Sequence, residues 1–130
     1  MILWFLHVVS YDIWFYISHR LLHTPFLYNI HKIHHEKRIP QWLDTYHAHW
    51  FESPFQSIGF FVPLLVFPLD KSQMLLAFLI CQIRGLMRHD ERTAFIDNGH
   101  HLRHHLNWNY NYGEEWIDWI FNTQETSLSP

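Results

Sequence analysis

Apolar residues dominate the first 23 positions, and neither Gly nor Pro interrupts them, so we expect one helix over residues 1–23. Thr24-Pro25 provides a stop signal directly after it. One set of polar residues recurs along this segment at steps of four, three and four: Asp12, Tyr16, His19 and His23. At 100° per residue these side chains lie within about 60° of arc. The pattern predicts a single polar stripe on an otherwise apolar helix.

Two strongly apolar runs follow later, at 55–69 and 74–83, with the polar stretch "DKSQ" between them. As a helix, the first run would extend about 23 Å, which is short of the ~30 Å hydrocarbon core of a bilayer. Pro63 and Pro68 would also bend it. We therefore expect an apolar hairpin over about 55–83 that dips into a bilayer and returns.

The hairpin decides which side of the membrane the flanking segments occupy. A single crossing would separate the segment before residue 55 from the segment after residue 83, whereas a hairpin leaves both on one face. Basic residues flank both ends, as the positive-inside rule expects of a cytosolic face: Lys32, Lys37, Arg38, Arg84, Arg88 and Arg92. The alternative is a soluble helical domain with a buried apolar hairpin. With 48% hydrophobic residues in 130 positions, one small globule has little volume for them, which favours the membrane.

The remaining segments complete an all-α prediction. We expect a second, basic helix over 26–38, a third polar helical region over 84–106, and an aromatic tail with a turn near Asn111 and Gly113. Residues 124–130 are expected to fray. The start of the chain lacks the basic region and cleavage site of a secretory signal, so we expect it to be retained. The predicted fold is a single domain over 1–130: a membrane-associated helical bundle.

Histidine changes this picture, because 13 of the 130 residues are histidines. The motif His-x-x-His-His occurs at 31–35 and again at 101–105, and His-x-x-x-His occurs at 19–23. On a helix these spacings place the rings on one face, where they can reach one metal ion. The three motifs contain eight histidines: His19, His23, His31, His34, His35, His101, His104 and His105. Because a first-row metal ion takes about four to six ligands, eight indicate two ions, and imidazole suits iron, zinc, copper and nickel.

Other residues suggest further members of the site and argue against several classes of enzyme. Several carboxylates near the motifs can accept an imidazole N–H and fix its tautomer, although any one of them can equally be a solvated surface charge: Asp12, Glu36, Glu52, Asp90 and Asp97. His7 is expected to pack, while the roles of His47, His49 and His100 stay open. The zincin, Gly-x-Ser-x-Gly, P-loop and dinucleotide-binding motifs are absent. The one thiol, Cys81, lies in an apolar run unsuited to a nucleophile, and the net charge of −3 argues against a nucleic-acid partner.

Two metal ions on neutral imidazoles beside an apolar surface favour one chemistry, the reductive activation of dioxygen against a lipid C–H bond. The order of these histidine motifs resembles that of the fatty acid hydroxylase/sterol desaturase superfamily. Within this superfamily, the chain resembles the sterol C-5 desaturases, also called lathosterol oxidases. The segments that carry the resemblance occur in the family's order: "DIWFYISHRLLHTPFLYNIHKIHH", "HAHWFESPFQS", "PLLVFPLDK", "HLRHHLNWNYNYG" and "IDWIFNT". Together they span about residues 10–123.

The resemblance implies an endoplasmic-reticulum membrane enzyme with its histidines facing the cytosol. It would introduce a C5–C6 double bond into a delta-7 sterol, with two iron ions, dioxygen and electrons from cytochrome b5. The implied metal ligands are the eight histidines together with His89 of "RHD". The implied residues around them are Asp12, Tyr16, Glu52, Asn111 and Tyr112. A basic face at Lys32, Lys37 and Arg38 would dock an acidic electron donor.

The chain also departs from the family pattern. It begins almost at the first motif, where the family normally has transmembrane helices, and Trp50 stands where proline is usual. The connector after His47 and the stretch after Gly113 are short. Three alternatives therefore stay open: a lipid hydroxylase of the same superfamily, a truncated non-catalytic metal-binding membrane protein, and a zinc hydrolase.

Overall fold

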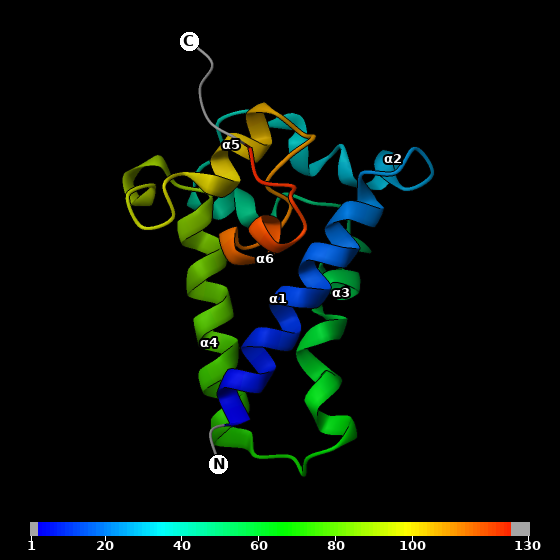
Figure 1. Cartoon of the computed structure of the whole chain (residues 1–130), viewed down its shortest axis with the longest axis vertical. Coiled ribbons are helices and arrows are strands. Elements are labelled where there is room, and N and C mark those ends of the chain that lie inside the picture. Colours follow the sequence, from blue (N-terminus) through cyan, green and yellow to red (C-terminus); the bar gives the residue numbers. More distant parts are fainter. Residues whose placement is uncertain (1–2, 126–130) are drawn as a thin grey trace.

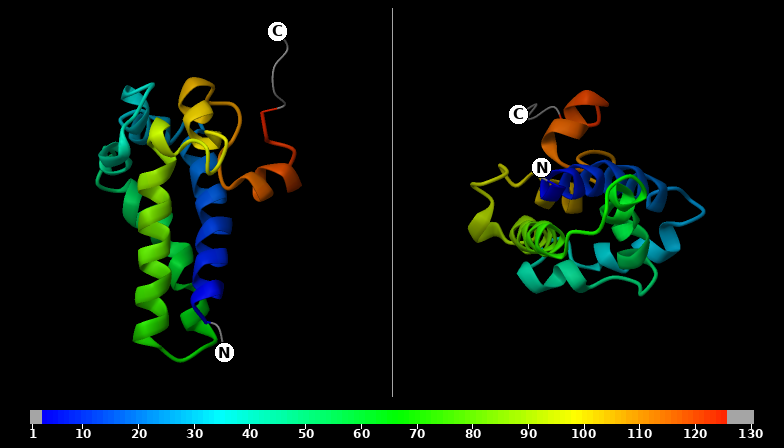
Figure 2. Two further views of the ribbon diagram at one scale, coloured as in Figure 1. Left: turned by 90° about the vertical axis from the view of Figure 1, so that its left-hand side faces the viewer. Right: turned by 90° about the horizontal axis from the view of Figure 1, so that it is seen from below.

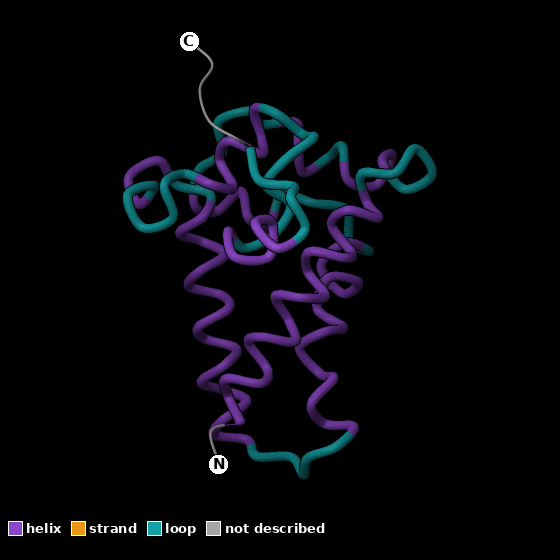
Figure 3. Tube along the Cα trace, in the orientation of Figure 1, coloured by secondary structure: helices purple, strands orange, loops and turns teal. Residues whose placement is uncertain are grey.

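The computed structural model describes residues 3–125, and every regular element in that range is helical (Figure 1, Figure 3). The elements are α1 (Leu3–Leu22), α2 (Tyr28–His31), η1 (His34–Glu36), η2 (Trp42–Tyr46), α3 (Glu52–Ser57), η3 (Ile58–Leu65), α4 (Lys71–Arg88), η4 (Glu91–Thr93), α5 (His100–Leu106) and α6 (Glu115–Ile120). The expected all-α class is confirmed. The fraying expected of the last residues falls mostly on 126–130, which lie outside the described residues.

The long elements and the short elements occupy different ends of the molecule. In Figure 1 α1, η3 and α4 run side by side through the lower half, while α2, α5 and α6 gather above them. The views together show α1 and α4 close to each other at their lower ends and farther apart towards their upper ends (Figure 1, Figure 2). The short elements therefore form a cap on a three-segment stalk.

Helix α1 confirms the first predicted element over its described residues. Asp12, Tyr16 and His19 of the polar stripe are buried, and His23, just beyond the helix end, is half-buried. The stripe thus faces inward, and the apolar residues of the helix include exposed ones such as Phe5 and Ile13.

The segment 55–83 descends and returns, as a hairpin does (Figure 1). Its descending arm is the 3₁₀ helix η3, with Pro63 inside it, because proline has no N–H to donate to a regular α-helix. Its returning arm is α4, whose N-cap Asp70 accepts hydrogen bonds from the backbone N–H of Ser72 and Gln73, both at 3.1 Å. Across the described residues no helix has both the length and the hydropathy needed to cross a bilayer.

One element prediction was wrong, and another was confirmed only in part. The segment 26–38 is not one helix, because a turn at Lys32–Ile33 separates α2 from η1. The region 84–106 is also broken: α4 continues to Arg88, and α5 begins only after Gly99, whose φ of +64° is left-handed. The first break puts His31 and His34 on different elements, and the second leaves His89 at the end of α4 and His101 in α5.

The interior is more polar than apolar. Among the described residues, eight hydrophobic side chains are buried against seventeen polar or charged ones. The small apolar cluster lies in the stalk, where Val8, Phe60, Ala77 and Cys81 pack together. Large apolar side chains are instead exposed along η3 and α4, among them Phe61, Val62, Leu65, Val66, Leu75, Leu76, Phe78, Leu79 and Ile83. The fold therefore buries most of its histidines and exposes much of its apolar surface.

Candidate metal centre

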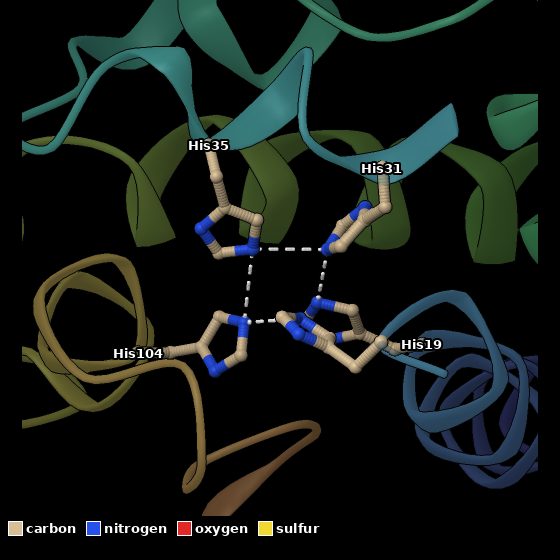
Figure 4. A group of neighbouring side chains, drawn as sticks. His19, His31, His35 and His104 are labelled. Atoms are coloured by element: carbon tan, nitrogen blue, oxygen red, sulfur yellow. Dashed lines mark hydrogen bonds between the residues drawn. The ribbon is translucent and has the colours of Figure 1, made fainter. Parts of the chain in front are cut away.

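Nine of the thirteen histidines gather in the cap, in two groups. The five-histidine group contains His19, His23, His31, His35 and His104, and the four-histidine group contains His34, His89, His101 and His105. Within each group the candidate ligand nitrogens all lie within 4.8 Å of one another. Figure 4 shows four rings of the first group converging from separate segments of the chain. These nine are the residues that the sequence and the family resemblance single out.

Each His-x-x-His-His motif contributes to both groups. The first motif sends His31 and His35 to the five-histidine group but His34 to the other. The second motif, on α5, sends His104 to the five-histidine group and His101 and His105 to the other. The repeated motif therefore interleaves two sites, which explains why the chain contains it twice.

Backbone carbonyls orient five of the rings. The Nδ1 atom of each faces a carbonyl oxygen: His19 that of Tyr112, His34 that of His47 at 3.1 Å, His89 that of Gly85 at 2.8 Å, His104 that of Tyr110 at 2.6 Å, and His105 that of Lys37 at 3.2 Å. Because a carbonyl only accepts hydrogen bonds, the proton of each neutral ring must be on Nδ1. The Nε2 atom, which points into the group, is then left with a bare lone pair.

Some of these bare nitrogens face one another. The Nε2 atoms of His19 and His31 are 2.9 Å apart (Figure 4). His31 donates its own Nδ1 proton to the Glu52 carboxylate at 2.9 Å. In the other group, the Nε2 atoms of His34 and His89 are 3.1 Å apart. With both Nδ1 atoms protonated, neither nitrogen of such a pair has a proton to share, so the two lone pairs repel unless a cation lies between them.

The spacing fits a metal ion. Nitrogens bound at about 2.1 Å and at right angles to each other lie about 3.0 Å apart. Four further Nε2–Nε2 distances are 3.0–3.2 Å: His31–His35, His23–His104, His35–His104 and His89–His101. The donor set is all imidazole, which suits iron, copper, zinc and nickel. The residues present therefore fit a transition-metal ion in each group.

Burial keeps these rings neutral. It penalises the charged imidazolium and lowers the pKa of His23 and His34 to about 4 and that of His105 to about 3. For the other six rings the same cause, with nearby histidines adding to it, lowers the pKa further below the usual value: His19, His31, His35, His89, His101 and His104. Near neutral pH all nine are thus neutral, with one ring nitrogen free of a proton, which is the form that a metal ion binds.

A cavity of about 140 Å³ reaches both groups. Its wall includes His19 and His31 from one group and His34, His89 and His101 from the other. The stalk completes it with Tyr11 and Phe15 of α1, Ser53 and Gln56 of α3, and Cys81 and Gln82 of α4. A molecule in this cavity would contact rings of both groups at once.

Three of the other predicted site residues lie beside the rings. Glu52 is buried, its second oxygen, Oε2, has no hydrogen-bond partner among the described residues, and burial raises the pKa of its carboxyl group to about 8. Tyr112 supplies the carbonyl for His19, and its ring centroid is 5.3 Å from that of His23. Asn111 has a left-handed φ of 59° and accepts from the Glu125 N–H at 2.8 Å, which shapes the turn before Tyr112.

Two predicted site residues have other partners. Asp12 pairs with Arg84 at 3.0 Å, and Arg84 also pairs with Glu114. The Tyr16 hydroxyl shares a hydrogen bond with Thr123 Oγ1 at 3.0 Å and accepts one from Arg20 at 3.1 Å. Both residues join α1 to neighbouring segments and make no hydrogen bond to an imidazole.

The histidines outside the groups also have identified places. His7 packs on Phe60, as expected, with Nδ1 2.7 Å from the Phe60 carbonyl. His47 pairs with Glu36 at 3.0 Å, and His49 accepts from the Phe51 N–H at 3.2 Å. His100 pairs with Asp118 at 3.0 Å.

Sequence reasoning missed Asp118. This fully buried carboxylate accepts hydrogen bonds from the N–H of Tyr112 at 2.9 Å, the N–H of Gly113 at 2.8 Å and the hydroxyl of Thr123 at 2.7 Å. It thereby fixes the turn whose carbonyls orient His19 and His104. The available signal was an acid inside the apolar "WIDWI", where a charge needs a structural reason.

Comparison with known proteins places this arrangement in a family. The model of the family "Fatty acid hydroxylase" matches residues 4–123. The Delta(7)-sterol 5(6)-desaturase of Leptosphaeria maculans is 34% identical over 109 residues, covering 79% of this chain and 31% of that protein. The lathosterol oxidase of Rattus norvegicus is 31% identical over 117 residues (83% and 39%), and the methylsterol monooxygenase 1 of Gallus gallus is 32% identical over 132 residues (91% and 44%).

The chain spans about a third to two fifths of the length of these relatives. No solved structure matches it. The match to the family model covers nearly the whole described chain, and it includes all nine grouped histidines. The chain belongs to the fatty acid hydroxylase family.

Proposed function

We propose that this chain is the metal-binding part of a membrane-bound oxidoreductase that desaturates a sterol. Each histidine group would hold one iron ion, and the enzyme would introduce a C5–C6 double bond into a delta-7 sterol. One observation carries the proposal: bare imidazole nitrogens face one another in two adjacent groups that line one cavity. The names of two relatives, a delta(7)-sterol 5(6)-desaturase and a lathosterol oxidase, support the substrate class.

Iron bound in both groups would supply the redox chemistry that activates dioxygen against an unactivated C–H bond. The chain's own residues do the rest. Backbone carbonyls and Glu52 hold the ring tautomers, so that the nitrogens face inward without reorganisation. Tyr11 and Phe15 give the cavity an apolar wall for the lipid, while Ser53 and Gln56 offer polar contacts on the α3 side.

The cavity is small for a whole sterol, so only the reacting part of the molecule would enter it. The remainder would lie along the exposed apolar surface of the stalk. That surface would contact the hydrocarbon of the endoplasmic-reticulum membrane, with the cap on the cytosolic side. Electrons would come from cytochrome b5.

The test combines metal content with product analysis. The full chain is expressed in cells that lack their own C-5 desaturase, and iron and sterols are measured in the same membranes. We expect about two irons per chain and a delta-5,7 sterol, both reduced in the His34→Ala variant. Bound iron without any lipid product that depends on His34 would instead favour a non-catalytic metal-binding protein, and zinc in place of iron would favour a hydrolase.

A hydroxylase is the second candidate, because the methylsterol monooxygenase covers more of this chain, 91%, than the desaturases named above. Desaturation and hydroxylation begin with the same removal of hydrogen, and the pose of the substrate decides between them. Mass spectrometry separates the outcomes: a product two hydrogens lighter than its substrate indicates a desaturase, and one oxygen heavier indicates a hydroxylase.

A further inference from the structure

A second depression opens on the cap, separate from the cavity described above. It has a volume of about 330 Å³ and shares no lining residue with the first cavity. Tyr28 and Asn29 of α2 form one side, and Trp108 and Tyr112, which follow α5, form the other. His23 of the five-histidine group lines it too. This groove therefore reaches the five-histidine group by its own route.

Trp108 connects the groove to both histidine groups. Its ring centroid is 5.5 Å from that of His35, a member of the five-histidine group, and 5.6 Å from that of Tyr28. Its Nε1 donates a hydrogen bond to the carbonyl of His105, in the four-histidine group, at 3.2 Å. The side chain is nevertheless 42% exposed. A large aromatic ring that is exposed on one side and packed against a candidate ligand on the other is typical of a contact point for a partner.

The rim of the groove is basic. The guanidinium carbon of Arg20 lies 5.6 Å from the centre of the Tyr112 ring, and Lys32 follows Tyr28 by one helical turn. Both side chains are exposed, and no carboxylate lines the groove. Residues 20–38 contain four basic residues and only one acidic residue, Glu36. A surface of this kind attracts an acidic partner and steers its approach.

We propose that this groove is the docking surface for an acidic one-electron carrier protein and that Trp108 is the side chain through which the electron enters. The proposal rests on the proposed function, because it requires a redox-active ion in the five-histidine group. The transfer would balance as one electron: the reduced haem of the carrier would lose it, and an iron ion held by the five-histidine group would take it up. No bond is made or broken.

Docking is tested first on the metal-free chain, so that binding is measured apart from catalysis. The probe is the soluble haem domain of cytochrome b5, and its Kd is measured at low and at high salt. We expect Lys32→Glu to weaken binding about tenfold at low salt and much less at high salt. The matched control is Lys71→Glu, which makes the same charge change at an exposed position at the far end of the stalk, and it should leave Kd within about twofold (Figure 1).

Electron entry is tested on the iron-loaded chain without oxygen, by following the reoxidation of the reduced haem domain in a stopped-flow instrument. Trp108→Leu should slow the transfer at saturating donor about tenfold or more, whereas Trp108→Phe, which keeps an aromatic ring, should stay within about threefold of the wild type. Iron content and reduction by dithionite should be unchanged in both variants, which shows that the centre itself is intact.

The outcomes separate the two proposals. A wild-type chain that binds no iron, or whose iron dithionite cannot reduce, contradicts the proposed function. An intact, reducible centre that accepts electrons from the haem domain equally fast in Trp108→Leu overturns only the inference. Equal weakening of haem-domain binding by Lys32→Glu and Lys71→Glu would also overturn the inference. The same holds if the chain does not bind the haem domain but binds vesicles of anionic phospholipid through Lys32.

Discussion

At the scale of single residues, the direction of each imidazole depends on which atom receives its Nδ1 proton. For five of the nine grouped rings that atom is a backbone carbonyl oxygen. His31 differs, because its acceptor is the buried carboxylate of Glu52. A carboxylate raises the basicity of the imidazole more than a neutral carbonyl does. The Nε2 atom of His31 should therefore be the strongest electron-pair donor to a metal ion among these rings.

Glu52→Gln tests that difference. The amide keeps the size of the side chain and can still accept the Nδ1 proton, but it removes the charge that strengthens His31 as a ligand. We expect the metal affinity of the five-histidine group to fall about 10–100-fold, measured by competition with a chelator at about pH 9, above the Glu52 pKa of about 8, so that the carboxylate is charged. Glu36→Gln is the control, since Glu36 is exposed and pairs with His47 outside both groups. An equal loss in the control would contradict a specific role for Glu52.

Metal stoichiometry tests whether the two groups bind independently. His104→Ala removes a ring from the five-histidine group, and His101→Ala removes one from the other, although both lie on α5. His101→Ala leaves three rings in its group and should lose about one of two metal ions per chain, measured by elemental analysis of the purified protein. His104→Ala leaves four rings, as many as the other group has, so it should keep both ions but bind one of them more weakly in a competition with a chelator. If either single variant released all the metal, the two groups would be one site.

The sequence identified the nine rings at this scale but not what holds them. The spacing of the histidines predicted eight of these ligands, and the family resemblance added His89. The carbonyl groups that accept the Nδ1 protons could not be predicted from the sequence, because every residue has a carbonyl and only the folded backbone determines where each one points. Asp118 was missed for a related reason, since its partners Tyr112 and Gly113 are backbone N–H groups in a turn.

At the scale of the elements, the pairing of α1 with η3 depends on one glycine. A Cβ atom on Gly59 would lie 2.2 Å from the Cβ of Trp14 and 2.6 Å from the carbonyl oxygen of Ser10. No side-chain rotation relieves either clash, because one involves the first atom of a side chain and the other involves backbone. The close approach also lets Phe60, the next residue, pack on His7.

Gly59→Ala should therefore lower the free energy of unfolding by about 1–3 kcal/mol, because α1 and η3 must move apart. Denaturant unfolding followed by circular dichroism provides the measurement. Gly85→Ala is the matched control: its nearest neighbour is Thr45 Oγ1 at 3.4 Å, and it lies within α4. There alanine should be neutral or stabilising by up to about 1 kcal/mol. Equal destabilisation by both changes would refute the close-packing argument.

The presence of a helix in a segment was easier to predict from the sequence than whether that helix is continuous. The stretch without Gly or Pro gave α1 correctly, and the apolar runs gave the hairpin-like path of η3 and α4. The breaks at Lys32–Ile33 and after Arg88 were not predictable from local periodicity. The first break accompanies the entry of His31 and His34 into different groups, and the second accommodates η4 and the Gly99 turn, so that His89 and His101 reach the same group from different segments. These tertiary contacts override the helical tendency of each segment.

At the scale of the whole molecule, the cap has a buried set of neutral bases. Burial lowers the folded-state pKa values of the nine rings below 6.5, so below that pH the unfolded chain binds more protons than the folded chain. Stability contributed in this way is fully present above pH 6.5 and is lost as the pH falls towards the folded-state values near 3–4.

The metal-free chain should therefore become less stable between pH 6.5 and pH 4, with a slope above the ~1.4 kcal/mol per pH unit of a single titrating group. Urea unfolding at a series of pH values measures the slope. Bound metal should move the loss to lower pH, because protons must then compete with the ion. A flat profile across this range would show that the rings are accessible to protons in the folded state.

The exposed apolar stalk leads to the last prediction, which concerns the membrane. Leu65 and Val66, at the turn of the hairpin farthest from the cap, are 83% and 78% exposed (Figure 1). If the stalk contacts lipid, a charge at each position must be moved into hydrocarbon at a cost of about 2–3 kcal/mol. Leu65→Glu combined with Val66→Glu should then release most of the protein from phospholipid vesicles in a flotation experiment.

Phe95→Glu combined with Ile96→Glu is the matched control for this experiment. Phe95 and Ile96 are 79% and 56% exposed, but they belong to the cap, after η4, and not to the stalk. The two substitutions add the same two charges at exposed apolar residues, so they should leave flotation nearly unchanged if the stalk alone enters the lipid. Equal release by both variants would assign the membrane contact to exposed apolar residues in general, and no release by either would leave the stalk facing a protein partner. The pattern expected here, with loss only at the hairpin turn, would place the nine histidines at the end of the molecule away from the bilayer centre.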